Sequence, residues 1–238
     1  GSSQISMIEA FEESCNVTFA EVALELGPER LAEQARAYGL CGTLPPDRTT
    51  CDEQLVRFEL PFENGRFPEP EYFERNDPLL AFSGIGLDND LVNPLQMALI
   101  ASAVANGGVM PQPRLVTEVR DAQGRVAREF GSRSVGTAIS GVSAAALTQM
   151  MISVVNEGSG FRAQIPGIQV AGKTGTATNG EGRPPNAWFT AFAPAGGQQS
   201  PRIAVSVIVL DGGDLGSEAT GGQVAAPIAR AVIEAYLR

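Results

Sequence analysis

The sequence predicts an α+β fold, and three observations support this prediction. Residues 168–174, 187–193 and 203–210 are apolar runs separated by turn residues, which is typical of strands with short connections. Strands that are joined in this way pair antiparallel. Residues 219–237 have the apolar content of a long helix, which we expect to cover the sheet.

The segment before the sheet is expected to begin with two helices. Residues 6–20 are predicted as one helix, because Ser6 and Glu9 have the spacing of a capping box. Residues 31–38 are predicted as a short amphipathic helix that ends at Gly39.

The middle of the chain contains stronger local signals. Residues 41–78 carry six prolines and are predicted as a loop. Residues 94–105 begin with a proline and are followed by Asn-Gly-Gly, which favours a helix. Residues 115–120 and 126–130 flank Asp-Ala-Gln-Gly, a hairpin signal. Residues 143–156 are predicted as a helix capped by their first residue, Ser143.

The length of 238 residues allows one domain with a sizeable core. We expect this single domain over residues 1–238. Within it, residues 1–160 form a lobe of helices and loops, and residues 161–238 form the antiparallel sheet and the C-terminal helix.

The composition excludes several classes of function. A formal net charge of −10 argues against nucleic acid as a partner, because phosphate contacts need a basic surface. The absence of histidine excludes Ser-His-Asp and Cys-His catalysis and histidine-based metal sites. Any nucleophile must therefore be activated by a lysine or a carboxylate, and we expect neither a metal nor a cofactor.

The three cysteines are too few for a disulfide scaffold. Cys41 and Cys51 flank a short loop that a disulfide could close in an oxidising compartment, and two unpaired thiols fit the spacing equally well. Cys15 is expected to be a small buried apolar residue.

The one lysine of the chain lies in a stretch that fits two unrelated motifs. Lys173-Thr174-Gly175 is the third motif of the penicillin-interacting serine enzymes. The segment from Gly167 to Thr174 also matches the phosphate-binding P-loop.

Local structure distinguishes the two motifs. A P-loop needs a strand before its first glycine and a helix that starts at the lysine. Here the alternating apolar residues Ile168 and Val170 lie inside the motif, and glycines and prolines follow Thr174. We therefore expect Lys173 on a strand that ends in a turn, facing a cleft and paired with residues 187–193.

A second motif, Ser14-Cys15-Asn16, is weak alone, because Ser-x-Asn triplets are common at helix surfaces and caps. Together with Lys-Thr-Gly it belongs to the motif set of penicillin-binding proteins and β-lactamases. Residues i and i+2 of a regular helix point about 200° apart. Both side chains can therefore serve one site only if this segment is a turn or a helix end.

Several longer stretches extend this similarity along nearly the whole chain. The chain resembles the C-terminal part of the transpeptidase domain of a class B penicillin-binding protein, of the penicillin-binding protein A type. The stretches that carry the resemblance are residues 9–16, 93–98, 105–108, 170–177 (Val-Ala-Gly-Lys-Thr-Gly-Thr-Ala) and 187–194 (Ala-Trp-Phe-Thr-Ala-Phe-Ala-Pro).

The resemblance implies a penicillin-binding-protein or serine β-lactamase-like fold and a D,D-transpeptidase that cross-links peptidoglycan stem peptides through a serine acyl-enzyme. It implies β-lactam antibiotics as ligands and an extracytoplasmic location at the bacterial cell membrane. It also implies partners among membrane-bound glycosyltransferases and the division machinery, through regions outside this chain.

The resemblance also implies residue roles. Ser14 would relay protons to the leaving amine, Asn16 would hold the substrate amide, and Lys173 would supply positive potential. Thr174 would bind the terminal carboxylate, and Gly175 would let the substrate backbone pair along the strand. The Thr176 amide would be one oxyanion donor.

One departure from the family pattern is serious. The first motif, Ser-x-x-Lys, needs a second lysine, and this chain has none. In the family this motif lies roughly fifty residues before Ser-x-Asn, so we expect it before Gly1, together with the first two strands of the sheet. The 238 residues would then be a fragment that is inactive alone. The alternative hypothesis is a natural, degenerate protein that lacks the first motif.

Two further functions stay open at this point. A β-lactamase or D,D-carboxypeptidase would share the motifs, and a class A β-lactamase also needs a deacylating glutamate. Glu59, Glu63 and Glu69 lie in the predicted loop, and no pattern selects one of them. A non-catalytic domain that senses β-lactams or peptides on the same fold is the second alternative.

Overall fold

The computed structural model describes residues 5–238 except 45–47, 50–55, 179, 181 and 198. Its main sheet contains β8 (Ala171–Ala177), β9 (Asn186–Ala193) and β10 (Ile203–Val209) in the order β10-β9-β8. Both pairs are antiparallel, and Lys173 lies opposite Thr190 in the register. The predicted α+β class and the antiparallel pairing are confirmed.

Strand β8 lies three residues further along the chain than predicted. Ile168 forms a tight turn with Ile165, whose carbonyl accepts a hydrogen bond from the Ile168 amide at 3.1 Å, so residues 168–170 precede the strand. At the other end, Gly175 to Ala177 continue the ladder against β9. The ladder is made by backbone groups, so glycine and threonine extend it as well as apolar residues do.

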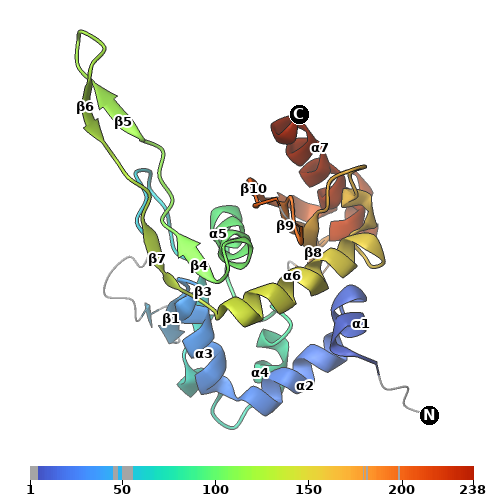
Figure 1. The fold of residues 1–238 in the computed structure, drawn as a ribbon. Helices are drawn as coiled ribbons and strands as arrows, with labels where there is room; N and C mark the ends of the chain where they lie inside the picture. The colour runs from blue at the N-terminus through green and yellow to red at the C-terminus, as the bar shows by residue number, and fades with distance from the viewer. Residues whose placement is uncertain (1–4, 45–47, 50–55, 179, 181, 198) are drawn as a thin grey trace.

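Helices cover both faces of this sheet (Figure 1). On one face α7 (Ala226–Leu237) contributes to a core formed by Val155, Ala163, Ile165, Val170, Phe189, Ala191, Ala193, Ala225, Ala226, Ala229 and Ile233. On the other face α5 (Pro94–Ala105) and α6 (Gly141–Asn156) contribute to a core formed by Ala101, Val104, Met151, Ala171, Phe192 and Ala195. The division of the domain at residue 160 stays a prediction.

The first predicted helix is in fact two helices. Helix α1 (Met7–Glu12) ends at a break, and α2 (Asn16–Leu26) starts after it. The predicted capping box of Ser6 and Glu9 is present. The break arises because Ser14 has φ 55°, in the left-handed region that stops a helix.

The next helix, α3 (Pro28–Ala37), begins three residues before its predicted start because Pro28 occupies the first helical position. Gly39 follows the helix with φ 77°, as expected for a residue at a helix stop.

The predicted loop over residues 41–78 contains regular structure, so this prediction was wrong. Strands β1 (Cys41–Leu44), β2 (Arg48–Thr49) and β3 (Arg66–Pro68) form a small sheet in the order β2-β1-β3. A 3-10 turn (Pro70–Phe73) and α4 (Asp77–Ser83) follow. Pro68 ends β3, where a proline is compatible with a short strand.

The cysteines differ in their state. Cys41, at the start of β1, is disulfide-bonded, and Cys51 lies outside the described residues. Cys15 has a free thiol and is half-buried rather than buried, because it occupies the N-cap position of α2.

The middle of the chain follows the local signals closely. Helix α5 has the predicted limits, and Asn93 caps it through a bond from the Gln96 amide. Strands β5 (Glu118–Arg120) and β6 (Val126–Glu129) form the predicted hairpin, which extends away from the rest of the chain in Figure 1. Helix α6 is capped by Ser140, whose hydroxyl accepts from the Ser143 amide, so the predicted cap at Ser143 was wrong.

Short elements complete the fold. They are β4 (Val109–Pro111), which pairs with β7 (Ser134–Thr137), the 3-10 turns Phe161–Ala163 and Leu210–Glu218, and a π-helical turn Gly221–Ala225. The predicted helix over residues 219–237 therefore divides into this turn and α7. Within the described part of the chain, no helix has the length and apolar content needed to span a bilayer.

We predict that Phe189→Ala lowers the free energy of unfolding by about 3–5 kcal/mol, since a fully buried ring between β8 and α7 is lost. Urea-induced unfolding measures this change. Val142→Ala is the control, because Val142 is 83% exposed and its truncation is expected to stay within about 0.5 kcal/mol. Equal effects of the two substitutions would contradict this account of the core.

Candidate active site

Lys173 lies in the middle of β8 and reaches the turn between α1 and α2. Its Nζ donates to Ser14 Oγ at 2.8 Å and to the Thr174 carbonyl at 3.1 Å, and it lies 5.4 Å from the centre of the Phe11 ring. The lysine is therefore a strand residue and not the start of a helix, which excludes the P-loop. The predicted pairing with β9 and the shared location of Ser14 and Lys173 are confirmed.

The backbone at Ser14 makes this contact geometrically feasible. Ser14 has φ 55°, and the Cys15 amide donates to the Ala10 carbonyl at 2.8 Å, so the chain turns sharply between the two helices. A non-glycine residue in this conformation is strained and persists only when its surroundings hold it. Asn16 is the first residue of α2 and is exposed, so Ser14 and Asn16 lie on one turn, as the motif requires.

The environment of Lys173 changes its acidity. Burial of the ammonium lowers the pKa of Lys173 to about 8. Loss of water disfavours the charged form, and the serine hydroxyl, the carbonyl and the aromatic ring only partly replace that water. Lys173 is thus a cation close to its titration range at neutral pH.

The next residues of β8 are held from two sides. The Thr174 hydroxyl lies 2.7 Å from the hydroxyl of Ser159, and the Thr176 hydroxyl accepts from the Gly221 amide at 3.2 Å. A Cβ at Gly221 would lie 2.0 Å from the Trp188 carbonyl oxygen and 2.6 Å from that of Gly175. Only glycine allows the π-helical turn to approach the strand this closely.

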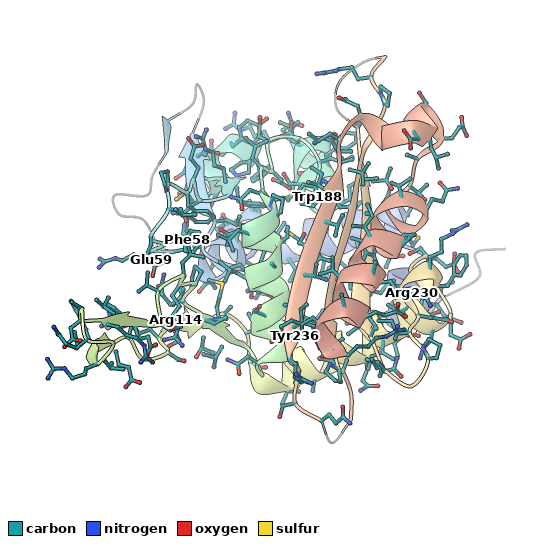
Figure 2. All side chains as sticks on the ribbon, turned by 90° about the horizontal axis from the view of Figure 1, so that it is seen from above. Phe58, Glu59, Arg114, Trp188, Arg230 and Tyr236 are labelled. Atoms are coloured by element: carbon teal, nitrogen blue, oxygen red, sulfur yellow. The ribbon has the colours of Figure 1, made fainter. Side chains whose placement is uncertain are left out.

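A cleft of about 690 Å³ opens along β8. One wall consists of residues 173–178 with Trp188, and the opposite wall includes residues 85–88, residues 90–92 and Arg66. The predicted residues Lys173, Thr174, Gly175 and Thr176 all line it, whereas Ser14 and Asn16, which were expected to face the same cleft, are not among its lining residues. A larger cavity of about 1060 Å³ lies between the end of α6 and α7, where Arg230 is labelled in Figure 2, and none of the predicted site residues lines it.

The wall opposite β8 contains a partly buried acid, Asp90. Burial raises the pKa of Asp90 to about 8, and the nearby charge of Asp88 acts in the same direction. The Ser83 hydroxyl donates to Asp90 at 3.1 Å and partly opposes this shift. The Asp90 carboxyl is therefore mainly protonated at neutral pH.

The three glutamates of the predicted loop lie elsewhere. Glu59 accepts from the Leu115 amide at 3.1 Å at the base of the hairpin, and in Figure 2 helix α5 lies between Glu59 and Trp188. Glu69 forms an ion pair with Arg36. Glu63 lies within 3.9 Å of Arg66 and does not line the cleft.

The described residues contain no group of three or more histidine, cysteine, aspartate or glutamate side chains that could hold a metal ion. The cleft offers hydroxyls, backbone amides, the Lys173 ammonium and the mainly protonated Asp90 carboxyl, and Arg66 and Asp88 also line it. This set suits a ligand that combines an extended backbone with a carboxylate.

Comparisons with known proteins agree with this geometry. The sequence model described as "Penicillin binding protein transpeptidase domain" matches residues 1–234. The chain belongs to this family. A relative named peptidoglycan D,D-transpeptidase PbpA, from Mycobacterium tuberculosis, is 37% identical over 238 residues, with 98% of this chain and 44% of the relative covered. The PbpA of Mycolicibacterium smegmatis is 36% identical over 237 residues, with the same shares covered.

A solved structure shares the fold over the full chain. The ceftriaxone acyl-enzyme of penicillin-binding protein A from M. tuberculosis superimposes with a TM-score of 0.84 at 35% identity, covering 100% of this chain and 50% of that one. These matches confirm the fold class and the predicted resemblance. The chain spans about half the length, or less, of the relatives that it matches.

Three residues at the site were not predicted from the sequence motifs. Ser159, Asp90 and Gly221 lie far from the recognised motifs in the sequence, and they meet β8 or its cleft only through the fold. A local signal exists for one of them. Ser159 stands between two glycines after α6, which is a pattern of close backbone approach.

We predict that Gly221→Ala destabilises the protein by about 1–3 kcal/mol, because the added methyl must displace the Gly175 and Trp188 backbone. Gly141→Ala is the matched control: it also lies in the first turn of a helix, and its Cβ would meet only an atom at 3.7 Å. Urea-induced unfolding of both variants checks the difference, and a Gly221→Ala variant as stable as its control would refute the tight approach.

We predict that Asp90 makes the protein less stable as pH rises from about 4 to about 8. The folded state keeps the Asp90 proton up to pH 8 and the unfolded state releases it near 3.8, so the folded state binds more protons in this window. Asp90→Asn should flatten the decline between pH 5 and pH 8 by on the order of 1 kcal/mol or more. Unfolding curves at the two pH values measure this, and equal declines would contradict it.

Proposed function

We propose that this chain forms part of the catalytic domain of a peptidoglycan D,D-transpeptidase. In this reaction a serine oxygen attacks the carbonyl of a D-Ala–D-Ala bond, the C–N bond breaks, and the protonated amine of D-Ala leaves. The acyl group then passes from the serine to an amine of a neighbouring stem peptide. The observation that carries the proposal is the 2.8 Å contact from Lys173 Nζ to Ser14 Oγ at an edge strand.

Two of the site residues are proposed to act in proton transfer and amide binding. Ser14 relays a proton to the leaving amine, because its hydroxyl accepts from the Lys173 ammonium and can pass a proton on. Asn16, exposed on the same turn, holds the substrate amide.

The strand residues are proposed to bind the substrate. The Lys173 ammonium and the Thr174 hydroxyl bind its terminal carboxylate, and Gly175 leaves room for the substrate backbone to pair with the open edge of β8. The Thr176 amide donates to the developing oxyanion.

The nucleophile is proposed to come from residues outside this chain. The only lysine of the chain lies in β8, in the Lys-Thr-Gly motif. These 238 residues therefore contain no second lysine for an activating Ser-x-x-Lys motif. The PbpA relatives are more than twice as long as the region that matches. We therefore place the acylating motif in a longer protein that contains this chain.

The substrates of that longer protein are proposed to be peptidoglycan stem peptides, and β-lactams are its inhibitors. Support comes from relatives named peptidoglycan D,D-transpeptidases and from solved structures of penicillin-binding protein A as ceftriaxone and penicillin G acyl-enzymes. Such substrates support our proposal that the site acts on the extracytoplasmic face of the cell membrane. Membrane-bound glycosyltransferases and division proteins are the proposed partners.

The alternative functions receive less support. A class A β-lactamase needs a deacylating glutamate, and Glu59, Glu63 and Glu69 do not line the cleft. The PbpA relatives of M. tuberculosis and M. smegmatis are named transpeptidases rather than β-lactamases or carboxypeptidases. The same two relatives are not named as sensor domains either.

We predict that the longer protein is acylated by a fluorescent penicillin and that the 238-residue chain alone is not. In the longer protein, Lys173→Ala should slow acylation roughly ten- to a hundredfold, because one charge-assisted hydrogen bond is worth about 1.5–3 kcal/mol. Time courses of labelling and of intact mass measure both results.

Arg162→Ala is the control for this experiment, because it removes an exposed cation that lines the other cavity. Its acylation rate should equal that of the unmodified protein. An adduct on the 238-residue chain, or normal acylation of Lys173→Ala, would contradict the roles proposed here.

A further inference from the structure

Ser159 occupies a junction between the two halves of the proposed site. It lies in the loop Gly158-Ser159-Gly160 that follows α6. Its hydroxyl is 2.7 Å from the Thr174 hydroxyl on β8 and 3.3 Å from the Glu12 carbonyl at the end of α1. Helix α1 leads directly into the turn that carries Ser14.

The loop is clamped from two sides by close backbone approaches. A Cβ at Gly158 would lie 2.7 Å from the Glu12 carbonyl oxygen, and a Cβ at Gly222 would lie 2.1 Å from the Ser159 carbonyl oxygen. The Ser159 amide also donates to the Glu12 carbonyl at 3.4 Å. The backbone at Ser159 is thus fixed against α1 and against the π-helical turn, while its hydroxyl stays exposed.

The hydroxyl protons in this junction can be counted. The Glu12 carbonyl can only accept, and each of the two hydroxyls has one proton to donate. If Ser159 donates to Glu12, then Thr174 donates to Ser159 and has no proton left for a ligand. If Ser159 donates to Thr174, the Thr174 proton is free to point into the cleft beside Lys173.

We propose that Ser159 is a positioning residue for the terminal carboxylate of the ligand. A bound carboxylate accepts a hydrogen bond from the Thr174 hydroxyl. The Ser159 hydroxyl then rotates, so that it donates to Thr174 Oγ1 instead of to the Glu12 carbonyl. The two hydroxyls then form consecutive hydrogen bonds in which each polarises the next, and the last of these hydrogen bonds is donated to the carboxylate. This inference rests on the proposed function, since it assumes that Thr174 binds the carboxylate.

To position the Thr174 hydroxyl, the side chain at position 159 needs only its own hydroxyl group. Threonine should therefore replace Ser159, because it keeps the hydroxyl and the exposed site has room for a methyl group. Valine has the shape of threonine and lacks the hydroxyl. Ser159→Thr and Ser159→Val are thus a matched pair that separates the hydrogen bond from the packing of the loop.

The experiment measures acylation of the longer protein by benzylpenicillin and by benzylpenicillin methyl ester, which lacks the anionic carboxylate. Second-order rate constants come from intact-mass time courses. In Ser159→Val the rate with the free acid should fall about three- to tenfold, as for one neutral hydrogen bond, while the rate with the ester stays unchanged. Ser159→Thr should keep the free-acid to ester ratio of the unmodified protein within about twofold.

A second comparison tests whether Ser159 acts through Thr174. In a Thr174→Val background, Ser159→Val should change the free-acid rate less than twofold, because the intermediate hydroxyl is already gone. If Ser159→Val does not fold, Ser159→Ala replaces it with the same expectation.

The possible results separate this inference from the proposed function. A protein that neither compound acylates would refute the proposed function, and this inference with it. If the unmodified protein is acylated and Ser159→Val slows the reaction of the free acid and of the ester by the same factor, then Ser159 is a purely structural part of the clamp. Unchanged rates in Ser159→Val would show that its hydroxyl does not act on the carboxylate.

Discussion

The position of β8 at the edge of the sheet is the constraint on which the rest of the site depends. One side of β8 pairs with β9 over seven residues, and its other side has no partner strand among the described residues. Gly172 makes this pairing compatible with the core, since a Cβ there would lie 2.4 Å from the Phe189 ring. The fixed strand presents Lys173 to Ser14 and leaves backbone groups available to an extended ligand.

The sequence was sufficient where the signals are local. Asn93 and Pro94 start α5, and the Asp-Ala-Gln-Gly turn joins β5 and β6, because capping and turn preferences act over a few residues. The contrast between a P-loop and a strand was also a local question. The glycines and prolines after Thr174 correctly argued against a helix there, although the alternating residues Ile168 and Val170 lie before β8. The motif set and the resemblance then predicted the fold of the whole domain.

The sequence was insufficient where tertiary contacts decide the backbone. No glycine or proline near Ser14 marks a helix end in the sequence, and the capping box of Ser6 and Glu9 marks only the start of α1. The break is held from outside, by Lys173 at the serine hydroxyl and by Ser159 at the Glu12 carbonyl. The small sheet of β1, β2 and β3 was missed for the same reason, since its strands have two to four residues and depend on pairing between distant segments.

The two shifted groups of the cleft would make the proposed carboxylate binding depend on pH in one direction. Burial acts on the two shifted groups in opposite senses, lowering the pKa of Lys173 and raising that of Asp90, each to about 8. Below this value the lysine is cationic and the aspartic acid is neutral, so the potential along β8 favours an anion. Above it the lysine loses its charge and the opposite wall gains a negative one. In a chain with a net charge of −10, a protonated acid across the cleft from the single lysine would favour the anion binding that we propose for this edge.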